Sequence, residues 1–521
     1  MTKLELNRYL NTFALFSITI GGIIGAGIFV FPVAIASYAG PSVLISLLIA
    51  TLIVILVAMA YTEFSSSFQK SAAPYALPRA ALGNFGGFFM GWCYFLFLFI
   101  GSAAIINLFV VYLGRFIPVF VQQTALTSFG TGFAIIILWI ITFYHSLGIK
   151  WSAKFAIYTT IIKLVLIFAF IVMGLYYFNP KNFSPFMPYD FSGILIVIPF
   201  LLWEFSSFAS SAILTSETID SNYTIVKSMK WSILISFGVF LLICLVFVGV
   251  IDWDILNLHS TDWVSLKKIY SPYEAIAASM KQTHLTKILL FSSLFAGLSS
   301  MGNRILIQGR IPFAMAQDGV FFNYLSKINP EFKTPISALF FGSALSTLLL
   351  LIIPDFSFGM LFSCFPVLLP YGVSMISIAI LRNSYKDVPR FYKMPKIKIL
   401  APTGFVLISI IMYLGSWPWT MINVFLVCSA YPAYFIVTRR KNIEFKRNLW
   451  IPIYLIGIMI ISIFGSKKFI YNNFTNFEPF NYLRTPLDLI VLTIFSLSIF
   501  YWVYKINIKK VEMEKKVQLP S

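Results

Sequence analysis

Long apolar runs separated by shorter polar segments recur from one end of the chain to the other. A helix needs about 20 residues to cross the ~30 Å hydrocarbon core of a bilayer, and most of these runs reach or approach that length. We therefore predict fourteen membrane-spanning helices, at residues 12–36, 41–62, 86–113, 129–147, 153–178, 191–214, 230–251, 286–303, 336–353, 357–381, 399–416, 419–437, 449–466 and 486–504. The segments between them leave no room for a separate soluble domain.

The composition agrees with lipid as the main solvent. Of the 521 residues, 59% are hydrophobic and 11% are charged, a balance that excludes a water-soluble chain of this size. The net charge of +19 would suit a nucleic-acid-binding protein, but most of the 38 lysines and arginines fall in alternate loops. Because positive charge gathers in cytoplasmic loops, we predict a multi-pass protein of the plasma membrane with both termini in the cytoplasm and no nucleic-acid partner.

The sequence contains no pattern typical of enzymes or metal sites. The four cysteines lie within apolar runs and form no CxxC pair, and the three histidines share no helix face. A nucleophile elbow, an HExxH motif and a phosphate-binding loop are all missing. We therefore expect no enzymatic activity, no cofactor and no metal.

The first predicted span contains a glycine-rich segment that we expect to break the helix. Residues 20–29 read IGGIIGAGIF, with four glycines in close succession. Irregular backbone inside a membrane requires partners for the freed N–H and C=O groups, so such a break usually lines a binding site. The alternative is close helix packing, since Gly21 and Gly25 have the spacing common at helix contacts.

The sixth span has a second weak point, at residues 203–211 (WEFSSFASS), where four serines compete for backbone hydrogen bonds and Glu204 places a carboxylate in the membrane. Two interrupted spans five apart in order are typical of transporters built from inverted repeats. We therefore expect repeats at about 12–178 and 191–382, with a site between the breaks. Half-helix N–H groups there would bind a carboxylate and carbonyls would bind an ammonium group, which suits an amino acid.

Three motifs resemble those of the amino acid-polyamine-organocation superfamily of permeases. They are GGIIGAGIFVFP at 21–32, YTEFSSSFQKSAAPY at 61–75, and RIPFAMAQDG at 310–319 with Thr334-Pro335 after it. The second motif departs from the family, because Ala72-Ala73 replaces its usual glycine pair. The resemblance extends over about residues 10–440.

This resemblance implies an all-α integral membrane protein with the five-plus-five inverted-repeat fold of the leucine transporter. The transport core would occupy residues 1–382, and helices eleven and twelve would lie at 383–437. Residues 438–521 would add two further helices and a basic cytoplasmic tail, so that about four C-terminal helices bring the total to fourteen. The implied activity is secondary active transport of amino acids by alternating access.

The resemblance assigns substrate binding to residues at the two breaks, namely Ile23, Gly25, Ala26, Gly27, Trp203, Ser206 and Ser207. The backbone at the first break would bind the substrate's carboxylate, and carbonyls near Ile23 and Trp203 would bind its amino group. The indole of Trp203 would cover the substrate as a gate. Ala26 stands where the family often has a serine, so carboxylate recognition there would depend on the backbone.

The sixth span departs from the family's pattern in a way that bears on the substrate. Ser207 replaces a glycine, and the family's usual acid is missing, whereas Glu204 lies five residues before that position. A site without an acid near the substrate's side chain would favour neutral amino acids, which is our first hypothesis. Glu204 turned inward would favour cationic amino acids or polyamines, and because each residue turns a helix by about 100° the sequence does not decide its facing.

Lys163 lies near the middle of the fifth span, where an ionisable residue is costly and usually functional. Exclusion of water favours the neutral form of a lysine, so Lys163 is a candidate proton carrier, with Glu204 as its partner in coupling. The resemblance agrees, since proton-coupled relatives have a lysine here in place of bound sodium. We expect a proton gradient rather than sodium to drive transport. The alternative is a static salt bridge between Lys163 and Glu204.

Ser299, Ser300 and Asn303 form a polar stripe on the eighth span that would line the pathway or hydrogen-bond to neighbouring helices. Glu63 at the end of the second span is predicted to form an interfacial salt bridge. Glu217 and Asp220, which follow the sixth span in a region with Lys227 and Lys230, are predicted to do the same. A rival function is a nutrient sensor that binds an amino acid on the same scaffold without transporting it. The expected partners are the lipid bilayer and an amino acid, and the sequence leaves the oligomeric state open.

Overall fold

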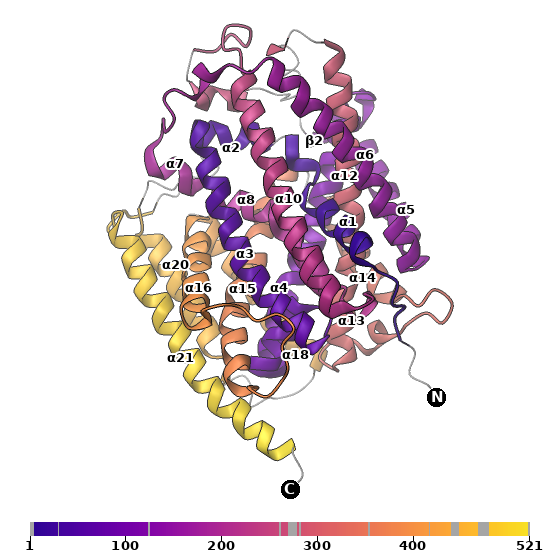
Figure 1. Ribbon diagram of the computed structural model, residues 1–521, viewed down its shortest axis with the longest axis vertical. Coiled ribbons are helices and arrows are strands. Elements are labelled where there is room, and N and C mark those ends of the chain that lie inside the picture. The colour runs from indigo at the N-terminus through magenta and orange to yellow at the C-terminus, as the bar shows by residue number, and fades with distance from the viewer. Residues whose placement is uncertain are drawn as a thin grey trace.

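The computed structural model describes residues 5–29, 31–122, 125–259, 262–268, 279–280, 283–352, 355–415, 417–438, 447–466 and 479–518. The chain is mostly helical (Figure 1). Its α-helices are α1 (Thr12–Ile23), α2 (Phe31–Ala39), α3 (Val43–Phe68), α4 (Ala73–Leu113), α5 (Ser128–Ser146), α6 (Ile149–Tyr176), α7 (Asp190–Ile196), α8 (Ile198–Phe205), α9 (Ser210–Ile213), α10 (Ser221–Val250), α12 (Thr283–Gln308), α13 (Arg310–Gln317), α14 (Ile336–Ile352), α15 (Phe356–Ser384), α16 (Ile397–Leu414), α17 (Trp419–Cys428), α18 (Ala430–Thr438), α20 (Trp450–Phe464) and α21 (Leu487–Gln518).

Short 3-10 helices and one strand pair connect or interrupt these elements. The 3-10 helices are η1 (Ala26–Phe29), η2 (Gly40–Ser42), η3 (Pro118–Phe120), η4 (Pro180–Phe183), η5 (Ser206–Ala209), η6 (Thr215–Glu217), η7 (Trp263–Lys268) and η8 (Asn323–Ser326). Strands β1 (Val121–Gln122) and β2 (Ala125–Leu126) pair antiparallel, with Val121 opposite Leu126. The two 3-10 helices that matter most are η1 and η5, because both interrupt apolar helices.

The described helices identify a multi-pass membrane protein. Ten helical stretches are long and apolar enough to cross a bilayer, and the shorter apolar helices α1, α14 and α20 accompany them. Large apolar side chains such as Ile140 on α5, Phe168 on α6 and Ile494 on α21 are exposed on the outside of the bundle. Lipid is the solvent that makes such a surface stable. The total of fourteen spans stays a prediction.

Several helices extend beyond the spans that the apolar pattern predicts, and two of them, α4 and α12, bear on the site. Helix α4 begins at Ala73 rather than at residue 86, and it kinks at Gly83, whose φ of 84° suits glycine. Arg79 and Asn84 near this kink hydrogen-bond to each other at 3.0 Å, and their polarity hid this part of the helix. Helix α12 continues to Gln308, five residues past the predicted end, so that Arg304 lies inside it.

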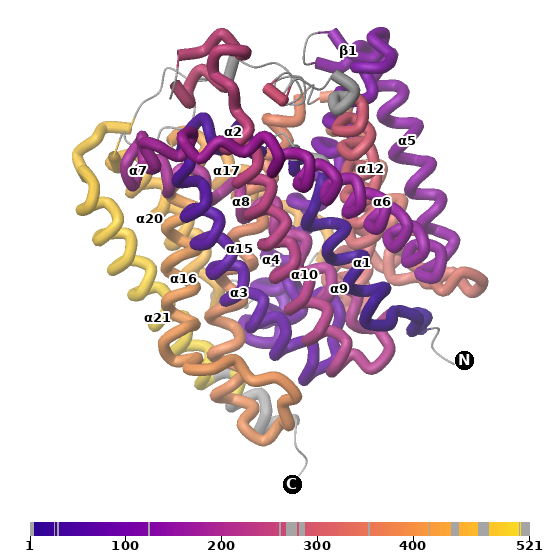
Figure 2. Tube along the Cα trace, turned by 45° about the horizontal axis from the view of Figure 1, so that its top comes forward, coloured from indigo at the N-terminus to yellow at the C-terminus, as the bar shows by residue number. Residues whose placement is uncertain are grey.

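The bundle is built around α4, which contacts both α12 and α15. Helix α1 lies against α6, α10 and α12, and it also contacts η5. Helices α16, α20 and α21 lie together along one side (Figures 1 and 2). The start of α1 and the end of α21 lie toward the same end of the bundle (Figure 1). The two helix interruptions therefore meet in the interior, between α6 and α12.

Candidate functional site

The predicted break in the first span is present. Helix α1 ends at Ile23, and the chain passes through Ile24 and Gly25 into η1 before α2 begins. The second interruption lies where predicted, because α8 gives way to η5 at Ser206. The breaks approach closely at Gly22, where a methyl group would lie 2.7 Å from the Ser207 and Asn303 side chains. Glycine therefore lets the two broken helices and α12 meet.

Lys163 holds the broken end of α1. Its ammonium, fully buried on α6, donates hydrogen bonds to the carbonyl oxygens of Gly21 at 2.7 Å and Ile24 at 2.6 Å. A third hydrogen bond, of 3.1 Å, reaches the Ser299 hydroxyl on α12. The last carbonyls of a helix have no intrahelical partner. The ammonium thus stabilises the carbonyls that the break leaves free, as a cation suits the C-terminal end of a helix.

Glu204 faces the first break, which the sequence left undecided. A methyl group placed on Gly27 would lie 2.0 Å from Glu204 Oε1, and one placed on Gly25 would lie 3.7 Å from Oε2. The carboxylate is buried, and no described residue hydrogen-bonds to its Oε1 atom. Among the described residues no ion pair joins Glu204 to Lys163, whose hydrogen bonds go to backbone and serine instead. The static salt bridge considered from the sequence is therefore not formed.

Arg304 is a central residue that the sequence analysis missed. It lies on α12 with 2% of its surface exposed, and its guanidinium carbon stands 4.4 Å from the Phe97 ring centroid and 4.8 Å from that of Trp203. Its Nε and Nη1 atoms have no hydrogen-bond partner in the part of the chain that the structure describes. Arg304 falls one residue beyond the predicted span 286–303, so it was assigned to a loop. Its spacing of four from Ser300, which places both on one helix face, could have revealed it.

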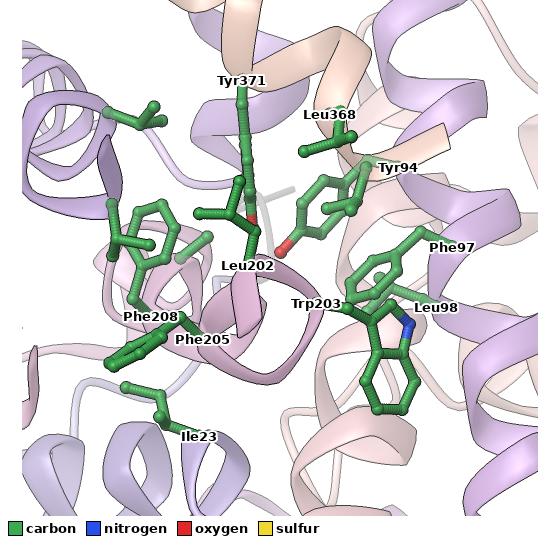
Figure 3. Packing of buried hydrophobic residues seen from close by; sticks show 14 of the residues in the cluster. Ile23, Tyr94, Phe97, Leu98, Leu202, Trp203, Phe205, Phe208, Leu368 and Tyr371 are labelled. Atoms are coloured by element: carbon green, nitrogen blue, oxygen red, sulfur yellow. The ribbon is translucent and has the colours of Figure 1, made fainter. Parts of the chain in front are cut away.

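Aromatic side chains enclose this part of the site. The Trp203 indole N–H donates to the Ser363 hydroxyl at 2.8 Å, and its ring centroid lies 6.1 Å from that of Phe31 and 6.0 Å from that of Phe356. Phe97 lies beside the indole, with Tyr94 next to it (Figure 3). Trp203 is thus fixed in place over the buried charges by a hydrogen bond and by neighbouring rings.

The carbonyls proposed for the substrate's amino group already accept hydrogen bonds within the chain. The Ile23 carbonyl accepts from the Gly25 N–H at 3.0 Å. The Trp203 carbonyl accepts from the Ser206 hydroxyl at 2.5 Å and also from the Ser206 backbone N–H. Because a carbonyl oxygen has two lone pairs, the Ile23 carbonyl retains capacity for a second donor, whereas the Trp203 carbonyl already has two.

The predicted polar stripe on α12 takes part in the same cluster, mostly through interhelical hydrogen bonds. The Asn303 amide donates to the Ile18 carbonyl at 2.6 Å and its oxygen accepts from Ser210 at 3.2 Å. Ser299 accepts from Lys163, and the Ser300 hydroxyl lies 2.9 Å from where a methyl group on Gly25 would be. The structure therefore brings the predicted residues together, apart from the side chain of Ala26, which lies outside its described part.

Two other buried carboxylates lie away from the breaks and are fully paired. Glu217 accepts two hydrogen bonds from Arg310, of 2.9 and 3.1 Å, and Glu63 accepts from Arg382, from Arg390 at 2.9 Å and from the Met394 N–H at 2.8 Å. Both residues thus form salt bridges as predicted, but the carboxylates are buried, and Glu217 pairs with Arg310 rather than with Lys227 or Lys230. The Glu217 carbonyl also accepts from the N–H groups of Tyr9 and Leu10, which fastens the N-terminal segment.

Comparison with known proteins gives a consistent result over most of the chain. A family model described as Amino acid permease matches residues 10–464. The chain is 27% identical to the branched-chain amino acid permease BcaP of Bacillus subtilis, covering 84% of this chain and 94% of that protein. It is 23% identical to the glutamate/serine transporter AimA of the same organism, over 96% of this chain and 94% of AimA. It is 22% identical to the Bacillus subtilis aspartate-proton symporter, over 95% and 96% of the two chains.

Proposed function

Because the chain belongs to the amino acid permease family, we propose that it is a secondary active transporter that moves an amino acid across the membrane together with protons by alternating access. The observation that carries this proposal is the Lys163 ammonium, held by carbonyl oxygens at the break of α1. An ionisable group inside the membrane that touches a helix break is well placed to link a proton to a movement of that helix.

The coupling step proposed for Lys163 follows from its hydrogen bonds. The charged ammonium binds the Gly21 and Ile24 carbonyls and ties α6 to the broken end of α1. Loss of the proton removes the charge and weakens these charge-assisted hydrogen bonds. The position of α1 relative to α6 then depends on the protonation of Lys163, and substrate binding at the same break depends on it reciprocally.

The proposed architecture is the five-plus-five inverted repeat, with repeats at about 12–178 and 191–382 inside a core at 1–382. Helices eleven and twelve would occupy 383–437, and 438–521 would complete fourteen spans. One line of support is that the interruptions at η1 and η5 meet in the interior. Another is that the start of α1 and the end of α21 lie toward the same end of the bundle. We propose that this end faces the cytoplasm.

The proposed substrate site is the space between the breaks, with the backbone at Gly25 to Gly27 for the carboxylate and the Ile23 and Trp203 carbonyls for the amino group. Trp203 would act as the gate. The names of the relatives support an amino acid as cargo, yet they range over branched-chain, acidic and small polar side chains. The test therefore includes neutral and acidic amino acids, together with the cationic substrates of the alternative hypothesis.

The proposal is tested with the full chain reconstituted in proteoliposomes. Uptake of labelled leucine, serine, glutamate, aspartate, lysine and spermidine is measured with an inward proton gradient, with a sodium gradient and with none. We expect accumulation of an amino acid with the proton gradient and its loss with a protonophore. Uptake that follows sodium alone contradicts proton coupling, and binding without flux under every gradient would make the chain a sensor.

A further inference from the structure

The site contains a buried arginine, Arg304, two of whose guanidinium nitrogen atoms have no hydrogen-bond partner among the described residues. Phe97 and Trp203 lie within cation–π distance of the Arg304 guanidinium, 4.4 and 4.8 Å from their ring centroids. Rings that interact with a guanidinium in this way do not supply acceptors for its N–H groups. Among the described residues, the Nε and Nη1 atoms have no hydrogen-bond partner, although Arg304 is only 2% exposed. Burial of N–H groups without an acceptor is unfavourable, so an acceptor that binds to them would stabilise the cluster.

Glu204 does not supply this anion in the structure. The two residues interact electrostatically, yet Glu204 Oε1 is also without a hydrogen-bond partner. Elsewhere the same chain joins a buried arginine to a buried carboxylate directly, since Arg310 binds both oxygens of Glu217. A bidentate pair of that kind would satisfy both groups at once. Arg304 and Glu204 do not form such a bidentate pair, so the Nε–H and Nη1–H groups of Arg304 can donate to another acceptor.

The position of Arg304 relative to the first break points to a ligand. Ser300, one helical turn before Arg304, faces Gly25 in the break. The rise along α12 between Ser300 and Arg304 is about 6 Å, so one small molecule can reach both the break and the guanidinium. An amino acid whose α-carboxylate and ammonium lie at the break would direct its side chain toward Arg304 and the aromatic rings around it.

The balance of buried charge favours an acidic side chain. Counted with all three groups ionised, Lys163 and Arg304 bring two positive charges into the buried cluster and Glu204 brings one negative charge, an excess of one positive charge. A neutral amino acid is a zwitterion and leaves this excess unchanged, and a cationic one increases it. An acidic amino acid brings one extra negative charge and cancels it, which lowers the cost of enclosing the cluster in a medium of low dielectric constant.

We propose that Arg304 binds the side-chain carboxylate of the substrate, so that the chain selects acidic amino acids over neutral and cationic ones. This proposal rests on the proposed transport function, because it assumes that the bound amino acid is the transported substrate. It differs from the neutral-substrate hypothesis, because the predicted eighth span ends before Arg304. The guanidinium would supply charge-assisted hydrogen bonds to the carboxylate, while Phe97 and Trp203 stabilise its charge in the absence of water.

The test is equilibrium binding of labelled glutamate, aspartate, leucine and lysine to the purified full chain, which needs no transport. The variants are Arg304→Gln, Arg304→Lys and, as a charge-matched control, Arg115→Gln in the exposed turn after α4. We expect the native chain to bind an acidic amino acid at least about tenfold more tightly than leucine, the factor typical of one charge-assisted hydrogen bond. Arg304→Gln should remove this preference and leave leucine binding within about threefold, less than half the free energy of a tenfold change. Arg304→Lys should keep part of it.

Three results would overturn the proposal. They are tighter native binding of leucine or lysine than of both acidic amino acids, equal weakening of all four ligands by Arg304→Gln, and no amino acid binding at all. Equal weakening would mean that Arg304 binds the α-carboxylate. If Arg304→Gln does not fold, the proposal is judged from the preference of the native chain for acidic amino acids over leucine and from the change in that preference in Arg304→Lys. Binding of acidic amino acids without flux in the liposome assay would contradict transport but not the role proposed for Arg304. Flux of leucine without binding of acidic amino acids would support transport and contradict the role proposed for Arg304.

Discussion

The carboxylates at one end of the bundle and the carboxylate at its centre differ in their partners, although all are buried. Glu217 accepts two hydrogen bonds from Arg310, and Glu63 is bound by two arginines and a backbone N–H. Glu204 at the break has an oxygen without a partner, and the nearby Arg304 has two unpartnered nitrogen atoms. The same chain thus contains buried charges that are fully paired and buried charges that are not.

This difference separates stability from function. A paired buried charge is strongly destabilising to break, because the remaining partner is left without compensation. An unpaired buried charge is unfavourable in the folded protein to begin with, so removal of it relieves a cost. Residues that persist in spite of such a cost are candidates for binding or proton transfer. Burial alone therefore does not identify the site, whereas unsatisfied hydrogen-bonding capacity does.

The largest effect on stability is expected where the buried carboxylate is paired with an arginine. Glu217→Ala leaves the buried Arg310 without its carboxylate and should destabilise the protein by about 3–5 kcal/mol, the range for a broken buried ion pair. The midpoint of thermal unfolding in detergent measures it, with Glu331→Ala at an exposed loop position as the control. Equal midpoints for the two variants would mean that the pair does not contribute to stability.

An intermediate effect is expected at the break itself. The methyl group of Gly27→Ala would lie 2.0 Å from Glu204 Oε1 and 2.4 Å from the Phe31 ring, so these side chains must shift at a cost of about 1–3 kcal/mol. Gly238→Ala on α10 is the matched control, because, apart from the adjacent residues and the local helix backbone, no described atom lies within 4 Å of its added methyl group. We expect a lower unfolding midpoint and weaker substrate binding for Gly27→Ala only, and unchanged binding would argue against a site at Gly27.

The smallest effect on stability is expected at Glu204, the carboxylate at the helix break. Glu204→Gln removes a charge that has an unsatisfied oxygen, so its unfolding free energy should stay within about 1 kcal/mol of the native value. Proton-driven uptake should nevertheless fall, because Glu204 faces the break. A loss of stability as large as that of Glu217→Ala would remove the distinction between the two regions.

Much of the fold and part of the site are predictable from the sequence. The apolar runs indicate the spans, and the four glycines after Ile20 and the serines after Glu204 mark both interruptions correctly, since irregular backbone needs small or hydrogen-bonding residues. Lys163 was identifiable because a lysine in the middle of an apolar run is conspicuous. Its actual partners, the Gly21 and Ile24 carbonyls, depend on tertiary contacts that the run itself does not contain.

The missed features share a physical cause. Arg304 and the first residues of α4 lie where apolar runs end, yet they have partners on other elements. Aromatic rings surround the buried Arg304, and Asp318 after α13 binds Tyr75 and Arg79 of α4. A polar residue at the end of an apolar run looks the same in the sequence whether water or another helix surrounds it. The facing of Glu204 was undecided for a related reason, because it depends on how α8 and η5 pack against α1 and η1 rather than on α8 alone.

The central claim, that Lys163 couples protons to the movement of substrate, is tested most directly by comparing Lys163→Ala with the native chain in proteoliposomes. Lys154→Ala is the control, since Lys154 lies on the same helix over the ring of Trp151. The account predicts that Lys163→Ala loses accumulation driven by the proton gradient but still exchanges labelled for unlabelled amino acid, while Lys154→Ala behaves like the native chain. Accumulation by Lys163→Ala that still follows the proton gradient would contradict it.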